Sequence, residues 1–551
     1  MQNTRPAAWS SRTVLRSGLA AAALGAVGAA TGCTARPAPT AASPARRHLI
    51  GPRSPQVAAT EAARHATGIV QAGVAPEAGH LDLGGPVVPT WSFGGQVPGP
   101  EIRVRAGQNL QALLVNRLPV ETSVHWHGVA IRNDMDGVPG MTQAPVPAGQ
   151  EFTYSFAVAK PGTYWYHPHV GVQLDQGLYG PLIVEDPAEP ADYDHDWTVV
   201  LDDWIDGTGY TPDQVLDALR NGMGGMSMAA ASPSPSPMMS SMGGMSGMPM
   251  PSSSASSASS APADTPARPS GPSPVLSGAR SALLGGDAGD VRYPWYLING
   301  RVRTAPRTFA ARSGQRARIR FINAAADTSF RVALGGHQMT VTHTDGYPVT
   351  PVRAGALLIG MGERYDVQVT LGDGMFPLTA LAEGKNATAL ALVRTGLGEK
   401  PPATVRPAEL NGPLAHYGAL HAAERARLAV REPDVTHRLR LTGGMTRYDW
   451  GVNGQAFDMS RSGALQFPMR EGQRVRVVFA NATTMYHPMH IHGHTFQVGQ
   501  AGPRKDTVIV LPGQQLACDF DAANPGQWMT HCHNLYHAPQ GGMMAALSYQ
   551  A

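Results

Sequence analysis

The ten residues GQRARIRFIN at positions 314–323 show the pattern on which the chain is built. GQNLQALLVN at 107–116 and GQRVRVVFAN at 472–481 repeat it, each with a Gly-Gln pair and an Asn nine positions after the Gly. Within 316–321 arginine alternates with apolar residues, which is typical of a β-strand whose two faces differ. The three copies therefore predict three β units of one design, each entered through a turn.

The length and composition agree with several β domains. At 551 residues the chain is too long for one hydrophobic core, and its 63 Gly and 47 Pro favour a structure with many turns. We place domain one at 67–187, domain two at 188–397, a connector at 398–436 and domain three at 437–551. An insertion at 221–290 interrupts domain two, and we expect a short helix at 422–430 in the connector. The insertion is rich in Ser, Pro, Gly and Ala, which predicts disorder.

Residues 1–33 have the features of an export signal. The apolar run at 19–30 is too short to span a bilayer, and it follows three basic residues, Arg5, Arg12 and Arg16. The run closes with Ala-Thr-Gly-Cys33, which resembles a bacterial lipobox and implies a lipid on Cys33, with plain secretion as the alternative. We expect an exported protein of the cell envelope, with 34–66 as a Pro/Ala-rich tether.

The charge of the chain excludes one class of partner. The net charge is +3, and residues 1–32 hold three arginines and no acidic residue, so the remainder is about neutral. A neutral chain gives no reason to expect nucleic acid or an acidic membrane surface as a partner. Nothing in the sequence predicts a protein partner.

Eleven of the 20 histidines fall into four clusters. On a strand, residues i and i+2 point to one face, so a His-x-His pair can converge on one metal ion. A single pair is more often a solvated strand face, whereas four pairs in repeat-related positions indicate a metal site. The clusters are His125-Trp126-His127, His167-Pro168-His169, His487-Pro488-Met489-His490-Ile491-His492 with His494, and His531-Cys532-His533 with His537.

The clusters are in register with the repeat. Nine and eleven positions after Asn116, and again after Asn481, stand the histidines of the first and third clusters. At the same offsets from Asn323 stand Val332 and Leu334. We therefore expect the first and third units to face each other across a shared metal site, while the second unit has core residues there.

Cys532 adds a second kind of ligand. It stands between two histidines, so on a strand its sulfur points away from the imidazoles of His531 and His533 and can bind a different metal ion. A thiolate with two imidazoles and a long Met contact is a blue-copper ligand set, and Cys532, His487 and His537 supply its first three members. Zinc fits poorly, because a structural zinc site is closed by four ligands and this sequence offers too many imidazoles.

Together these motifs resemble those of the multicopper oxidases, over residues 85–190 and 290–551. The resemblance implies an all-β fold of three cupredoxin-like Greek-key β-sandwich domains and four copper ions. It implies that electrons leave a substrate singly at a type 1 copper, and that four of them reduce dioxygen to water at a type 2 copper and a type 3 pair. It implies a type 1 site of His487, Cys532, His537 and Met543, a type 2 site of His125 and His490, and a type 3 site of His127, His167, His169, His492, His531 and His533.

Two positions carry open alternatives. The family usually places its axial Met five residues after the last His, where this chain has Gly542, so Met543 stands one position late and Met544 or no axial ligand is the alternative. Asp136 matches an acidic position that the family has near the three-copper site, where a carboxylate could relay protons. The alternative for Asp136 is a turn-forming Asp-Gly pair.

The distribution of methionine along the sequence suggests the substrate. Nine of the 23 methionines lie between Met223 and Met250, inside the insertion. Thioethers are soft ligands that select Cu(I), so the insertion is interpreted as a Cu(I)-gathering arm, with a low-complexity linker as the alternative. Copper-resistance oxidases of the family also carry Met-rich segments, which favours Cu(I) as the substrate. The competing hypotheses are a laccase-type oxidase of phenols or aromatic amines and a copper carrier without oxidase activity.

Overall fold

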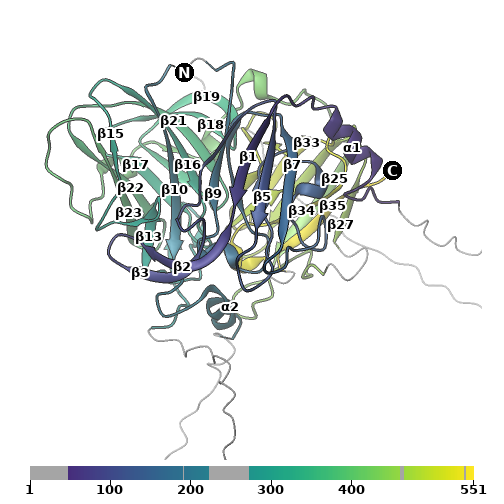
Figure 1. The fold of residues 1–551 in the computed structure, drawn as a ribbon, viewed down its shortest axis with the longest axis horizontal. Coiled ribbons are helices and arrows are strands. Elements are labelled where there is room, and N and C mark those ends of the chain that lie inside the picture. The colour runs from purple at the N-terminus through teal and green to yellow at the C-terminus, as the bar shows by residue number, and fades with distance from the viewer. Residues whose placement is uncertain (1–47, 190–191, 222–271, 459–464, 539–541) are drawn as a thin grey trace, which may run out of the picture. The chain divides into compact units, whose positions relative to one another are not determined.

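The computed structural model describes residues 48–189, 192–221, 272–458, 465–538 and 542–551. Strands are the dominant secondary structure of these residues, with only two short α-helices among them, which confirms the predicted all-β class (Figure 1). Among the described residues there is no helix long and apolar enough to cross a membrane. The predicted export signal, with Cys33, lies outside the described residues.

Domain one has two main sheets and a hairpin. The first sheet has the order β1 (Ile69–Val74), β5 (Gln108–Val115), β7 (Glu151–Val158). The second has the order β4 (Ile102–Arg105), β9 (Gly180–Glu185), β8 (Gly162–His167), β6 (His125–His127). The hairpin joins β2 (Pro76–Asp82) to β3 (Val87–Phe93). Two short 3-10 turns follow the histidine strands, η1 (Asn133–Met135) and η2 (Gln173–Gln176).

Domain two has two larger sheets. One has the order β14 (Arg301–Val302), β13 (Trp295–Ile298), β10 (His195–Trp204), β16 (Arg316–Asn323), β21 (Arg364–Thr370), β18 (Met339–Thr344), β19 (Tyr347–Ala354). The other has the order β15 (Thr308–Ala310), β23 (Ala387–Arg394), β22 (Met375–Ala382), β17 (Phe330–Leu334), β20 (Ala356–Ile359), β24 (Leu414–Ala415). The helix α2 (Pro212–Asn221) follows β10.

Domain three repeats this plan. One sheet has the order β26 (Gly451–Val452), β25 (Val435–Thr442), β28 (Arg474–Asn481), β33 (Gln515–Asp521), β30 (Phe496–Val498), β31 (Arg504–Lys505). The other has the order β27 (Gln466–Met469), β35 (Met544–Tyr549), β34 (Gln527–Cys532), β29 (His487–Ile491), β32 (Thr507–Val510). A 3-10 turn, η6 (Leu535–His537), follows β34.

The sequence repeat is a repeat of topology. The repeat strands β5, β16 and β28 each pair in parallel with an earlier strand and antiparallel with a later one. The second sheet of each domain contains an antiparallel trio, namely β6-β8-β9, β17-β22-β23 and β29-β34-β35. The histidine clusters lie on the first and third trios, and Val332 of the second trio pairs with Ala380 where the others pair two histidines.

The Asn that closes each copy of the repeat has a structural role. The side-chain amide of Asn116 donates to the carbonyls of Val120 and Val146, and its oxygen accepts from the amide of Leu118. Asn323 and Asn481 make the same three kinds of hydrogen bond, with the amide donating to one nearby and one distant carbonyl. Each Asn therefore ties the end of its strand to the loop that leads into the second sheet.

The expected tether at 34–66 is wrong for its described part. The helix α1 (Pro55–Ala62) lies there, and Leu49 makes a β-bridge to Gln550. Ile50 and Val57 are buried, so apolar burial holds this segment on the folded chain. Glu61 of α1 accepts from the backbone amide of Ala157 on β7, and Figure 1 shows α1 near the C-terminus of the chain.

The expected disorder of the insertion at 221–290 is wrong for 272–290. Here β11 (Arg280–Ser281) and β12 (Gly286–Asp287) form a small hairpin. The apolar side chains of Ala279, Leu284 and Ala288 are buried, which gives this end of the insertion a core. The Met-rich stretch itself, 223–250, lies outside the described residues.

The helix expected at 422–430 in the connector is also wrong. Only a 3-10 turn, η5 (Glu424–Ala426), forms there, besides η3 (Ala408–Asn411) and η4 (Tyr417–Ala419) earlier in the connector. The amide of Leu428 donates to the side chain of Gln497, 2.8 Å away, instead of to a helix carbonyl. A tertiary contact has therefore outweighed the local helix preference.

Candidate metal centre

Strand pairing brings the four histidine clusters together in two pairs. In domain one β6 pairs with β8 so that His125 stands opposite His167. In domain three β29 pairs with β34 so that His490 stands opposite His531. Each sheet thus carries imidazoles from two clusters at one edge.

The two sheets present these imidazoles to each other across the boundary between domains one and three. The rings of His125 and His492 stack with centroids 3.9 Å apart, and those of His127 and His490 stack at 3.8 Å. Domain two contributes no ring to these stacks. As the sequence predicts, imidazoles from the first and the last third of the chain therefore lie together in one buried group.

Within this group, sets of ligand atoms lie within 4.8 Å of one another, close enough to hold a metal ion. All members are buried except His169, which is half-buried. The sets are His125, His127 and His490; His127, His167 and His533; His169, His492 and His531; and His125, Asp136 and His492.

The hydrogen bonds of three of these rings leave one nitrogen of each free for a metal. The Nδ1 atoms of His125, His167 and His490 lie 2.8–2.9 Å from the backbone carbonyls of Asp136, Pro168 and Asp506, so each carries the ring proton. Among the described residues, nothing is hydrogen-bonded to the buried Nε2 atoms of these three rings. Buried nitrogens without a proton or a partner fit metal ligation.

Burial also keeps the rings neutral. It lowers the pKa of His167, His169 and His492 well below the ordinary value, and neighbouring imidazoles lower it further. The same causes act on His531 and His533. Neutral imidazole is the form that binds a metal ion, so the group is ready for ligation without first losing protons.

The carboxylate of Asp136 contacts the Nδ1 atoms of two of these rings. Its carboxylate lies 2.9 Å from Nδ1 of His492 and 3.2 Å from Nδ1 of His125, and it is fully buried. The Asp-Gly turn of the alternative interpretation is also present, since Gly137 has a φ of +80° and a Cβ there would clash with the backbone of Val124. The turn brings the carboxylate to the two rings, so the two interpretations are compatible.

Cys532 belongs to a second, adjacent set. Its Sγ lies 3.5 Å from Nδ1 of His487 and 3.6 Å from Nδ1 of His537, and those two nitrogens are 3.2 Å apart. The far nitrogens have partners, because His487 Nε2 lies 2.8 Å from the hydroxyl of Thr483 and His537 Nε2 lies 3.2 Å from Asp290. Burial raises the pKa of the Cys532 thiol, so a bound cation is needed to hold it as a thiolate.

The structure distinguishes the two candidate methionines. The carbonyl of Met543 accepts from the amide of Cys532, and its own amide donates to the carbonyl of His537. Met543 is fully buried in the same hydrophobic cluster as Cys532. Met544 packs in a different cluster and lines a cavity with Met529. These contacts favour Met543 as the residue beside the Cys532 set.

His494 has no place in either set. It is buried, its Nδ1 lies 3.1 Å from the carbonyl of His492, and its Nε2 lies 2.8 Å from the hydroxyl of Tyr549. With both nitrogens engaged, it supports the third cluster and does not offer a ligand atom.

Comparison with known proteins agrees with this geometry. Models of multicopper oxidase domains match residues 77–189, 279–397 and 431–551. Multicopper oxidase MmcO of Mycobacterium tuberculosis is 47% identical over 89% of each chain. This chain belongs to the multicopper oxidase family. Multicopper oxidases are copper-dependent oxidoreductases, so the predicted enzyme class is confirmed.

Other relatives of this multicopper oxidase are more distant. A copper resistance protein A homolog of Pseudomonas syringae pv. tomato is 27% identical over 82% of this chain and 87% of its own. A laccase-2 of Botryotinia fuckeliana is 27% identical over 84% and 78%. The crystal structure of a multicopper oxidase from Pseudomonas thermotolerans matches with a TM-score of 0.61 at 26% identity, covering 88% of this chain and all of that one.

Several residues that hold the ligands carry no signal of their own in the sequence. Asp290, Asp506 and Thr507 contact ligand rings, but each lies far from its partner along the chain. Lys505 ends β31, Asp506 follows it and Thr507 begins β32, so in sequence the three residues look like an ordinary connection between two strands.

Proposed function

We propose that this multicopper oxidase binds four copper ions and couples the one-electron oxidation of Cu(I) to the four-electron reduction of dioxygen to water. The observation that carries the proposal is the place of Cys532 on β34, with its thiol in one ligand set and the imidazoles of His531 and His533 in the other. Three consecutive residues thus link an electron-accepting site to an oxygen-reducing site by covalent bonds.

The residues are assigned to the coppers as follows. His487, Cys532, His537 and Met543 would hold a type 1 copper, and His125 and His490 a type 2 copper. The type 3 pair would be held by two sets of three, His127, His167 and His533, and His169, His492 and His531. When bound, the copper ions supply the one-electron steps and the place where dioxygen is reduced.

The residues around the site would orient ligands, exclude water and move protons. Backbone carbonyls fix the proton on Nδ1 of His125, His167 and His490, which directs Nε2 towards the metal. A cavity of about 780 Å³ reaches His167, His169, His531 and His533 and would admit dioxygen. Asp136, in contact with two rings, is the carboxylate proposed to relay protons for water formation.

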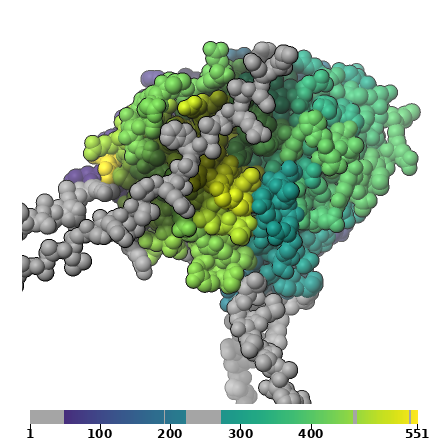
Figure 2. Space-filling view, turned by 180° about the vertical axis from the view of Figure 1, so that it is seen from behind, coloured from purple at the N-terminus to yellow at the C-terminus, as the bar shows by residue number. Residues whose placement is uncertain are grey.

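The attachment points of the insertion support Cu(I) as the substrate. Arg220, next to its N-terminal end, lines a cavity of about 710 Å³ together with His537. Asp290, at its C-terminal end, contacts Nε2 of His537. Figure 2 shows teal residues of domain two beside the yellow C-terminal residues of domain three. Residues on both sides of the segment that holds the methionines, Arg220 before it and Asp290 after it, therefore lie near the Cys532 set, to which soft thioethers could deliver Cu(I).

Deletion of the methionines tests this substrate. Removing 223–250 takes out nine methionines, and removing 251–271, which has no Met, is the matched control. We expect the first deletion to abolish dioxygen uptake with Cu(I) while uptake with a phenol is kept, and the control deletion to change neither. If both deletions leave Cu(I) oxidation intact, the Cu(I) proposal fails and the laccase-type alternative is favoured.

A phenolic substrate is the second candidate, favoured by the same cavity. Trp450 and Tyr448 line it, and the Trp450 ring lies 4.1 Å from the ring of His537. An aromatic donor held there could pass an electron directly to the Cys532 set. A copper carrier without oxidase activity would take up copper and consume no dioxygen with either donor, so an oxygen electrode separates the three hypotheses.

Export to the cell envelope, with a lipid on Cys33, is part of the proposal. Its support is the N-terminal sequence alone. Cell fractionation of the full-length protein and of Cys33→Ala tests it, because only the lipidated protein should remain with the membranes after a salt wash. Recovery of both proteins in the cytoplasm would contradict export itself.

A further inference from the structure

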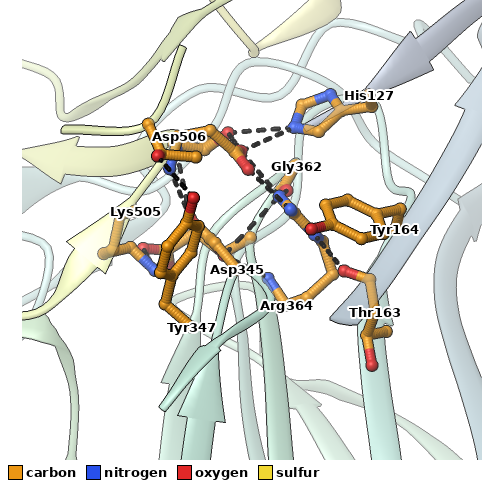
Figure 3. A network of polar contacts seen from close by, with 12 residues as sticks. His127, Thr163, Tyr164, Asp345, Tyr347, Gly362, Arg364, Lys505 and Asp506 are labelled. Carbon is orange, nitrogen blue, oxygen red and sulfur yellow. Dashed lines mark hydrogen bonds and ion pairs between the residues drawn. The ribbon is translucent and has the colours of Figure 1, made fainter. Parts of the chain in front are cut away.

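Domain two supplies no candidate ligand, yet besides Asp290, which contacts His537, a second of its side chains reaches the residues around the copper centre. Arg364, the first residue of β21, is fully buried. Its two terminal nitrogens each lie 2.6 Å from one carboxylate oxygen of Asp506, in domain three (Figure 3). Bidentate pairing of this kind fixes the plane of the carboxylate as well as its position.

Further hydrogen bonds hold both partners in place. The remaining donors of Arg364 reach the carbonyls of Thr163, at 3.0 Å in domain one, and Gly362, at 3.1 Å. Asp345 accepts from the backbone amide of Arg364 with one oxygen and from the amide of Asp506 with the other. Figure 3 shows the guanidinium between residues of all three domains.

The carboxylate that Arg364 holds is directed at a ligand ring. Oδ1 of Asp506 lies 3.1 Å from Nε2 of His127, and the hydroxyl of Thr507 lies 3.0 Å from the same nitrogen. Both carboxylate oxygens of Asp506 accept from Arg364, and Oδ1 also accepts from the hydroxyl of Thr507 at 2.9 Å. A carboxylate held in this way is an acceptor, so Nε2 of His127 carries the ring proton.

This arrangement reverses the tautomer found in the other rings. In His125, His167 and His490 the proton is on Nδ1 and the bare nitrogen is Nε2. In His127 the buried Nδ1 is the atom without a hydrogen-bond partner in the described part of the chain. His127 would therefore offer the metal a different nitrogen, which lies closer to the backbone and shortens its reach.

We propose that Arg364 is a positioning residue for the copper centre: by holding Asp506 against Nε2 of His127, it makes His127 bind copper through Nδ1. The inference rests on the proposed function, in which His127 is a type 3 ligand. It gives domain two a defined part in a site to which it contributes no ligand.

The competing explanation is that Arg364 only fills a buried ion pair between domains. Lys505 belongs to the same network, since its Nζ lies 3.2 Å from both Asp345 and Glu363. Two cations thus face three carboxylates, and any change there should destabilise the fold. A test must therefore separate loss of copper from loss of stability.

Arg318 offers a matched control. It lies on β16 of the same sheet, is 3% exposed, and pairs with Asp366 at 2.6 Å. Asp366 in turn accepts from the hydroxyl of Thr163, so this pair also joins domains one and two. Neither Arg318 nor Asp366 has a described contact with a candidate copper ligand, so Arg318→Lys reproduces the buried ion-pair change without touching His127.

The experiment compares the full-length protein with its Arg364→Lys and Arg318→Lys variants. Copper occupancy at each ligand set is measured by anomalous X-ray diffraction over a series of copper concentrations, with thermal unfolding as the stability check. In Arg364→Lys we expect affinity at the His127, His167 and His533 set to fall about 10–100-fold, as for other residues that orient ligands. Occupancy at Cys532 and the blue absorption should stay unchanged, and Arg318→Lys should keep full occupancy at every set.

Three results would overturn the inference. The first is equal occupancy in the two variants, and the second is copper bound to Nε2 of His127 in the unsubstituted protein. If Arg364→Lys does not fold, Asp506→Asn removes the carboxylate at constant volume, and unchanged copper affinity there is the third. Absence of copper from this set in the unsubstituted protein would instead mean that the proposed function is wrong.

Discussion

At the scale of single residues, the contacts of Asp136 with two histidine rings predict an effect on turnover. Its carboxylate contacts His125 and His492, and it is the group proposed to supply protons for dioxygen reduction. Asp136→Asn keeps the shape and one hydrogen-bond acceptor but cannot carry a proton at neutral pH. We expect turnover to fall 10²–10⁴-fold, the range for loss of a general acid, with copper content retained.

Turnover is measured as dioxygen uptake, and copper content by elemental analysis of the same sample. Unchanged turnover would remove Asp136 from the mechanism. Loss of copper in proportion to turnover would show that its role is to orient the two rings.

A second residue-scale prediction concerns the axial position. Met543→Leu removes the axial donor and leaves three ligands in apolar surroundings. Cu(I), with its lower charge, tolerates the loss of a donor better than Cu(II) does, so we expect the reduction potential of the Cys532 set to rise. Met544→Leu is the control, because Met544 packs in another cluster. Redox titration of the blue absorption measures both. A shift in the Met544 variant alone would reverse the assignment.

At the scale of elements, the Asn residues of the repeats occupy equivalent positions, but we expect their substitution to affect copper binding differently. Replacement by Ala removes two hydrogen bonds to buried carbonyls and one from a backbone amide, and each group that is left unsatisfied costs about 1–3 kcal/mol. We expect Asn323→Ala and Asn481→Ala to lower the melting temperature similarly. Only Asn481→Ala should also weaken copper binding, because only its loop leads into a histidine strand.

Calorimetry and copper titration of the two variants test this. Equal loss of copper in both would mean that the Asn side chains act on global stability and not on the strands that follow them.

The elements also show where sequence reasoning is strong and where it is weak. The strands of the repeat and the convergence of the His-x-His pairs could be predicted, because a two-residue period fixes the direction of side chains within one strand. The turn at Glu424–Ala426 could not, because a side chain from domain three, Gln497, takes the amide that a helix would need. Arg364 could not either, since its role exists only where three domains meet.

At the scale of the whole molecule, burial of neutral histidine predicts acid sensitivity. Burial lowers the pKa of His494 to about 4, from about 6.5 in an unfolded chain. Between those values the unfolded chain binds a proton that the folded one does not, so this contribution to stability is present above pH 6.5 and is lost as the pH falls towards 4. The shift corresponds to about 3 kcal/mol.

Chemical denaturation of the copper-free protein from pH 7 to pH 4 tests whether stability falls with pH in this way. His494→Gln cannot titrate, so its stability should fall by about 3 kcal/mol less over that interval than that of the unsubstituted protein. Parallel pH profiles for the two proteins would show that His494 takes up its proton without unfolding.

The same buried group of imidazoles has a consequence for how the protein is made. Its members come from domain one and domain three, so a ribosome that has completed domain one has exposed half of a coordination shell. The other half does not exist until translation has passed His533. Loading with metal must therefore follow synthesis, and a prematurely terminated polypeptide could not retain the cluster.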